Sequence, residues 1–158
     1  MIVRLSKFLA LLCSSGFSVG LILTSVVIVE SWASLEPSVA IEWFEEFGLP
    51  LGLVMVPFGG LAAVFSAVAF LAPLLGHRKN GMDWFWFTAL VLTAATMLLL
   101  PLYFWEANTL FFDGVILPED VSAEIQRWKF WNWVRTILSV LASSIMLLAL
   151  LREARSSG

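Results

Sequence analysis

The stretch FLALLCSSGFSVGLILTSVVIV, residues 8–29, contains 22 consecutive residues without a charged side chain. An α-helix needs about 20 mostly apolar residues to cross a bilayer. Three further runs of this kind follow along the chain, at residues 49–75, 84–105 and 133–151. The sequence therefore predicts an all-α fold, an integral membrane four-helix bundle in which residues 1–158 form a single transmembrane domain.

The composition supports this fold class. Of the 158 residues, 60% are hydrophobic and 13% are charged, whereas soluble domains are about half apolar and a quarter charged. A soluble protein of this size has too little interior to hide such an excess of apolar side chains. The net charge of −3 also argues against a nucleic-acid partner, which requires a basic surface.

The distribution of basic residues predicts the orientation in the membrane. Loops that remain in the cytoplasm carry an excess of Lys and Arg. Six of the nine basic residues lie before the first run, between the second and third, and after the fourth: Arg4, Lys7, Arg78, Lys79, Arg152 and Arg155. We therefore expect a multi-pass protein of the bacterial inner membrane with cytoplasmic N- and C-termini. Residues 30–48 and 106–132 then form the outer loops.

The two outer loops carry helical signals of their own. In the first, Pro37 favours a helix start, and Gly48 followed by Pro50 favours its end. Apolar residues recur between them at helical spacing, so we expect a short amphipathic extracytoplasmic helix. In the second loop, Pro118 suits the first turn of a helix. No breaker follows it, so we expect a fourth helix that extends beyond the bilayer.

Small residues recur every four positions in the first two runs, which allows helix backbones to approach closely. Gly16 and Gly20 lie in the first run, and Gly59 and Ala63 in the second. We expect this spacing to serve packing within the chain rather than a dimer interface. Pro57 is expected to kink its helix, as is Pro101 in the third run.

Arg135 and Asn132 are the sharpest candidates for a functional site. Arg135 lies about one turn inside the fourth run, where a charge is costly without a partner or a route to water. It could anchor an anion or a carbonyl group, extend outward to water, or pair with Glu106 or Glu30. Asn132, one turn away on the same face, could bind a ligand or form a bond between helices.

Other candidates lie at the same outer level. Asn108 and Glu106 follow the third run, and Glu30 ends the first; each could equally be a polar helix end in water. Six tryptophans gather there as well: Trp32, Trp43, Trp105, Trp128, Trp131 and Trp133. Tryptophan commonly forms a belt at membrane interfaces. Six exceed what a belt needs, so we expect Trp43 and Trp128 to wall a pocket.

The sequence contains one histidine, His77, and one cysteine, Cys13. Zinc, copper and non-haem iron sites usually draw on several such ligands. We therefore expect no metal and no other cofactor.

Three short pieces of the chain resemble a known family. They are the stretch from Glu36-Pro37 to Trp43-Phe44 leading to Met55-Val56-Pro57, then Asn108, then Trp128-Lys129-Phe130-Trp131-Asn132-Trp133-Val134-Arg135-Thr136. The chain is similar to small four-helix membrane proteins grouped with anthrone oxygenases. Those enzymes oxidise an anthrone to an anthraquinone without metal or flavin. The resemblance implies that Trp128, Asn108 and Arg135 line the site.

The chain departs from that family at one position, because Asn132 stands where the family has histidine. Asparagine cannot shuttle protons near neutral pH. We therefore expect a binding protein or accessory subunit, with an outward aromatic pocket for a flat apolar molecule such as a lipid, a quinone or an aromatic compound. The alternative is a cofactor-independent oxygenase. The expected partners are membrane lipid, a small hydrophobic ligand, and other membrane subunits or copies of the chain.

Overall fold

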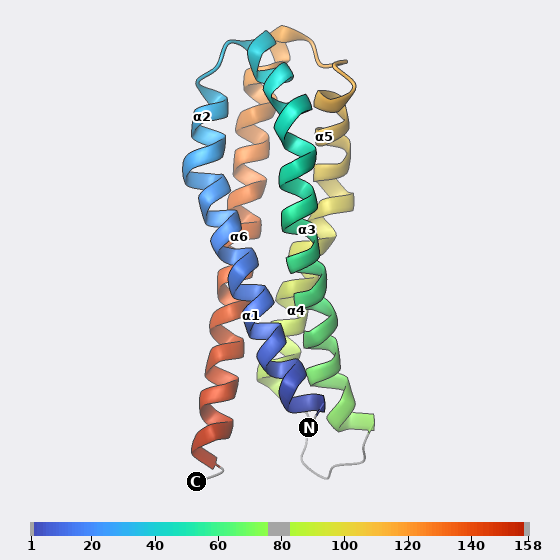
Figure 1. The fold of residues 1–158 in the computed structure, drawn as a ribbon, viewed down its shortest axis with the longest axis vertical. Helices are drawn as coiled ribbons and strands as arrows, with labels where there is room; N and C mark the ends of the chain where they lie inside the picture. Colours follow the sequence, from blue (N-terminus) through green and yellow to red (C-terminus); the bar gives the residue numbers. More distant parts are fainter. Residues whose placement is uncertain (1, 76–82, 157–158) are drawn as a thin grey trace.

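The computed structural model describes residues 2–75 and 83–156, and these residues form helices joined by short connections (Figure 1). The first helical rod is α1 (Ile2–Leu23), η1 (Thr24–Ile28) and α2 (Val29–Ala33). The second is α3 (Pro37–Leu75). The third is α4 (Trp84–Leu99), η2 (Leu100–Phe104) and α5 (Trp105–Phe112), and the fourth is α6 (Pro118–Ser156). The predicted all-α four-helix bundle is confirmed.

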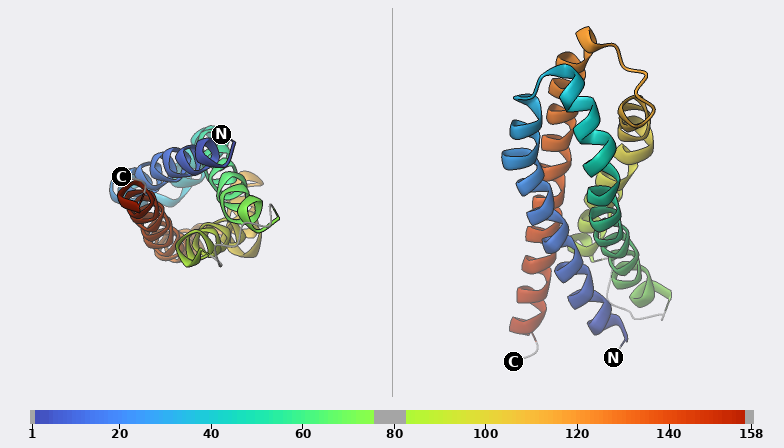
Figure 2. Two further views of the ribbon diagram at one scale, coloured as in Figure 1. Left: turned by 90° about the horizontal axis from the view of Figure 1, so that it is seen from below. Right: turned by 45° about the horizontal axis from the view of Figure 1, so that its top comes forward.

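The four rods stand side by side around a common axis (Figure 2). α1 packs against α3 and α6, and α4 packs against the same two helices. Both ends of the chain lie at one end of the bundle (Figure 1). We call the opposite end, which carries the connections 34–36 and 113–117, the distal end.

Among the described residues, each rod is long and apolar enough to cross a membrane, by length and composition. Large apolar side chains cover much of the outside, including Leu53, Leu75 and Leu102, of which Leu102 is 74% exposed. A protein surrounded by lipid gains nothing from hiding such groups, so this surface suits a bilayer.

The second rod differs from expectation, because the helix that begins at Pro37 does not end at Gly48 and Pro50. Residues 37–47 are amphipathic as predicted, with Ala40 and Phe44 buried and the glutamates exposed. Proline at position 50 removes the hydrogen bond to the carbonyl of Glu46. Glu46 and Pro50 both lie on an exposed face, where solvent can satisfy that carbonyl. The helix therefore continues to Leu75.

The fourth rod agrees with expectation, because α6 runs unbroken from Pro118 to Ser156. Pro118 stands at its first position, with Glu119 and Asp120 in the first turn. These carboxylates interact favourably with the positive end of the helix dipole.

Two π-helical turns interrupt the first and third rods. In η1 the N–H of Val29 donates to the carbonyl of Thr24, and in η2 the N–H of Trp105 donates to the carbonyl of Leu100. Both bonds span five residues instead of four. Pro101 lies at the start of η2 and has no N–H to continue the α-helical ladder. The kink expected at Pro101 thus takes the form of a π-turn, a feature often found at functional sites.

The small residues of the first two runs pack within the chain, as predicted. A Cβ on Gly20 would lie 2.3 Å from the sulfur of Met55 on α3, and one on Gly59 would lie 2.5 Å from the sulfur of Met97 on α4. These contacts leave no room for a larger residue unless the methionine side chains move, so the glycines form surfaces on which side chains of neighbouring helices pack.

A buried serine cluster joins α1 to α6, and the sequence analysis did not predict it. Ser18 Oγ lies 2.7 Å from Ser139 Oγ, and Ser14 Oγ lies 2.8 Å from Ser143 Oγ. The two helices run in opposite directions, so the serine four positions later on α1 pairs with the serine four positions earlier on α6. Hydroxyl groups of this kind hold apolar helices together across an interface.

Candidate functional site

A cavity of about 90 Å³ lies inside the bundle towards the distal end. Side chains from all four rods line it, and five of the seven predicted site residues are among them: Trp43, Asn108, Trp128, Asn132 and Arg135. The fold thus brings together residues from α3, α5 and α6 that lie up to about 90 positions apart in the sequence.

Arg135 is buried in this cavity, with 7% of its surface exposed. Its Nε atom has no hydrogen-bond partner, and no carboxylate in residues 2–75 or 83–156 forms an ion pair with it. The expected alternative, a pair with Glu106 or Glu30, is therefore wrong. Taking a guanidinium out of water without a counter-ion is expensive, so this arrangement calls for an explanation.

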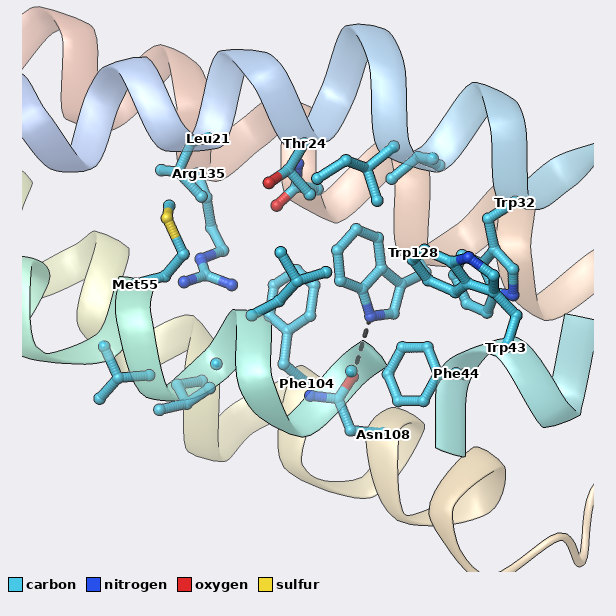
Figure 3. Close-up of a pocket in the computed structure, with 18 residues that line it drawn as sticks. Leu21, Thr24, Trp32, Trp43, Phe44, Met55, Phe104, Asn108, Trp128 and Arg135 are labelled. Carbon is cyan, nitrogen blue, oxygen red and sulfur yellow. Dashed lines mark hydrogen bonds between the residues drawn. The ribbon is translucent and has the colours of Figure 1, made fainter. Parts of the chain in front are cut away.

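Aromatic rings partly compensate the buried charge. The guanidinium carbon of Arg135 lies 4.4 Å from the ring centre of Phe104 and 5.7 Å from that of Phe17. Rings at this distance attract a cation through their negative faces. Figure 3 shows the guanidinium end directed into the space between Met55 and Phe104.

Asn132 takes part in a directional chain of hydrogen bonds. Thr136 Oγ1 donates its only hydrogen to the carbonyl of Asn132 at 2.8 Å. In its 3.1 Å contact with Ser25 Oγ, Thr136 must then accept. Ser25 Oγ in turn accepts from Asn132 Nδ2 at 2.8 Å.

This chain fixes the orientation of the Asn132 amide. A flipped amide would place two acceptors, Oδ1 and Ser25 Oγ, against each other. The chain therefore leaves Oδ1 as a buried acceptor without a partner. The expected bond between helices is present, and half of the amide remains unused.

Asn108 and Trp128 form a bond across the cavity wall. Trp128 Nε1 donates to Asn108 Oδ1 at 2.9 Å, which is drawn as a dashed line in Figure 3. The indole ring of Trp128 meets the ring of Phe104 edge-on at 5.1 Å. The bond fixes the orientation of both side chains, so the tryptophan presents a rigid apolar wall.

The six tryptophans named above lie in different environments. Trp32 is buried, contacts Trp43 and Trp128, and lines the cavity with them. Trp131 is half-buried against Tyr103. Trp105 and Trp133 are exposed on the outside of the bundle, where an interfacial belt stays a prediction.

Two predicted site residues lie away from the cavity. Glu30 is exposed and forms an ion pair with Lys129. Glu106 is exposed on α5. Neither carboxylate lines the cavity, so neither can neutralise Arg135. His77 lies outside the described residues.

Several cavity residues escaped the sequence analysis, namely Phe104, Met55, Leu100 and Thr24. Apolar side chains inside a membrane span look alike in a sequence. One signal was present, because Pro101 marks the π-turn η2 that supplies Leu100 and Phe104. The other π-turn, η1, supplies Thr24 and Ile28, so both irregular turns border the same cavity.

The cavity combines the guanidinium of Arg135, the free amide oxygen of Asn132 and aromatic side chains. Base catalysis by histidine has no candidate among the described residues, which contain none. No family model, no curated protein and no solved structure matches the chain.

Proposed function

We propose that this chain is a multi-pass membrane protein that binds a small, largely apolar molecule in the central cavity. Arg135 holds the oxygen-bearing end of that molecule. The observation that supports the proposal is a buried arginine directed into a cavity, for which the described part of the chain offers no ion pair and no hydrogen-bond partner at Nε. Charges inside membrane spans are costly and usually mark a functional site.

The walls favour an apolar and flat ligand. Phe104, Phe44 and Trp128 present rings to the cavity, and rings favour stacked or edge-on contacts with other rings. Pockets that enclose a drug-sized molecule measure about 300–1,000 Å³. A cavity of about 90 Å³ therefore encloses the polar end of a lipid, quinone or aromatic compound, and the rest of the molecule must extend beyond it.

The proposal includes an orientation in the bacterial inner membrane. With both termini in the cytoplasm, the distal end faces outward, and the cavity is reached from the outer half of the bilayer. The ion pairs at the ends of the rods, Lys7 with Glu153 and Lys129 with Glu30, then lie near the two interfaces. Membrane lipid covers the apolar outside.

The alternative, a cofactor-independent oxygenase, rests on the family resemblance. An oxygenase of this kind needs a base to remove a proton from its substrate. The amide at position 132 cannot act as one, and its nitrogen already donates to Ser25. A binding role, alone or as a subunit of a larger assembly, is therefore the function we favour. Oxygen consumption in the presence of an anthrone would instead support the enzyme.

The proposal can be tested with neutral probes on the full-length protein in a nonionic detergent. A short-chain ubiquinone quenches tryptophan on contact, and Trp32, Trp43 and Trp128 border the cavity. We expect saturable quenching of tryptophan fluorescence by the ubiquinone. The second probe is 1-naphthol, whose binding is followed by the shift that it causes in thermal unfolding. Failure of both neutral probes and of an ionised apolar acid such as 1-naphthoate to bind would contradict the proposal.

A matched pair of glycine variants locates the binding. A Cβ on Gly52 or on Gly60 would meet no atom within 4 Å, so both positions of α3 accept a larger side chain. Only Gly52 lines the cavity. Gly52→Leu should lower the affinity for the probe by tenfold or more, because the new side chain occupies its path. Gly60→Leu should leave it unchanged, and equal effects would place binding elsewhere.

A further inference from the structure

We infer that the ligand of this cavity is a monocarboxylate, an apolar molecule that ends in one ionised carboxyl group. The inference rests on the proposed function and names the chemical class of its ligand.

The charge of the cavity is the first argument. Arg135 is the one ionisable side chain among the described residues that line it, and Glu30 and Glu106 lie elsewhere. A neutral ligand would leave the guanidinium without a counter-ion in a medium of low dielectric constant, where attraction to an anion is strongest. A single negative charge balances it. A phosphate monoester carries between about 1.5 and 2 negative charges near neutral pH, which is more than one arginine neutralises.

The orientation of the guanidinium is the second argument. Its carbon lies 4.4 Å from the ring centre of Phe104, and the ring of Phe17 lies further away at 5.7 Å. Its nitrogens donate to no side chain or carbonyl among the described residues, and Nε is buried. The terminal nitrogens are therefore the part that a ligand can reach. Two N–H groups in a plane match the two oxygens of a carboxylate.

The size of the cavity is the third argument. A carboxylate has only three heavy atoms, so a volume of about 90 Å³ accommodates it with the first carbons of its apolar body. At Gly52 the wall of α3 is open, because an added Cβ would meet no atom within 4 Å. The rest of the molecule can leave the cavity at this point. The apolar body of the monocarboxylate can be an acyl chain or an aromatic ring, and the experiment distinguishes the two.

The experiment compares acids with neutral amides of the same shape. Decanoate and decanamide test an acyl body, and 1-naphthoate and 1-naphthamide test an aromatic one. Affinities are measured by calorimetry on the full-length protein in a nonionic detergent, at alkaline pH where carboxylic acids are ionised. We expect one of the acids to bind at least tenfold more tightly than its amide, and the better pair identifies the body.

Variants of Arg135 assign this preference to the guanidinium. Arg135→Gln should remove the preference for the acid and leave the affinity for the amide unchanged. Arg135→Lys should retain part of the preference, because it keeps the charge and loses the planar fork. Arg127→Gln is the control, because Arg127 is exposed and pairs with Glu124. It should change neither affinity.

Three results would overturn the inference. The acid and its amide could bind the wild type equally, decyl phosphate could bind more tightly than decanoate, or Arg135→Gln could keep the preference. In each case binding that still responds to Gly52→Leu would leave the proposed function standing. If the Arg135 variants do not fold, the Gly52→Leu variant provides the test. It should lower the affinity for the acid at least tenfold, and an unchanged affinity would refute the site.

Discussion

Arg135 on α6 lies over the ring of Phe104 on η2, with its guanidinium carbon 4.4 Å from the ring centre. This contact joins the fourth rod to the π-turn of the third. It places a cation against an apolar ring at a point where no carboxylate of the described residues pairs with it. On the proposed function, binding and stability therefore make opposite demands on position 135.

Arg135→Met should stabilise the protein in the absence of ligand. Methionine fills a similar volume and removes the buried charge, and apolar replacements of buried charged groups stabilise by about 1–4 kcal/mol in favourable cases. The measurement is thermal unfolding in detergent without added probe. Arg155→Met is the control, because Arg155 is exposed in the last turn of α6 and surface substitutions usually change stability by no more than about 0.5 kcal/mol. A lower melting temperature for Arg135→Met would show that the arginine already has a stabilising partner.

Ser25→Ala should destabilise the bundle. Ser25 Oγ accepts from Asn132 Nδ2 at 2.8 Å and is fully buried. Without it the amide loses its partner in an apolar interior, at a cost of about 1–3 kcal/mol. The control is Ser144→Ala, because Ser144 is exposed and bonds only to a carbonyl of its own helix. Equal unfolding temperatures for the two variants would contradict the chain of bonds described for Asn132.

Two substitutions of Glu153 should separate the contribution of its charge from that of its hydrogen bond, near the chain termini. Glu153 Oε1 accepts from Trp86 Nε1 at 3.1 Å and pairs with Lys7. Glu153→Gln keeps an acceptor for the buried indole and loses only the ion pair with Lys7, so it should cost less than removal of both interactions. Glu153→Leu removes that acceptor, and a buried unsatisfied donor costs about 1–3 kcal/mol. The melting temperatures of the two variants are compared by thermal unfolding. A lower melting temperature for Glu153→Gln than for Glu153→Leu would show that the bond to the indole is not the more important interaction.

Cysteine labelling should test the proposed orientation. Cys13 is buried and is the only cysteine, so a membrane-impermeant maleimide should find little background in intact cells. Asp113→Cys at the distal end should be labelled, and Arg155→Cys near the C-terminus should be labelled only after the cells are opened. Both native residues are exposed. The reverse pattern would show that the termini lie outside.

The number of rods and the unbroken course of α6 could be predicted because they depend on local properties. Long apolar runs identify the rods, and the chain from Pro118 to Ser156 contains no breaker. The end expected at Gly48 and Pro50 was wrong, because those residues only weaken a helix locally. Whether a helix ends there depends on solvent access to the carbonyl of Glu46 and on packing along both halves of α3, which a one-dimensional pattern does not contain.

The candidate site could be predicted in part for a related reason. Arg135 and Asn132 stand out because they are polar residues in or next to an apolar run. Glu30 and Glu106 looked equally suitable, and only the rotation of each helix about its axis shows that they face outward. Phe104 and Ser25 are ordinary residues for a membrane span. Their roles follow from the facing residues of other helices, and the sequence offers only the indirect sign of Pro101, which marks the π-turn that carries Phe104.

Each of the two π-turns holds one residue more than a regular α-helical turn. Each residue of an α-helix turns its neighbours by about 100°, so a deletion in a regular α-helix rotates everything beyond it by about that angle. If one residue were deleted within η2, the ladder could instead close as a regular α-helix, and Met97 on one side and Asn108 on the other could keep their present facing partners. A single deletion should therefore be tolerated better within η2 than in the α-helical turns beside it.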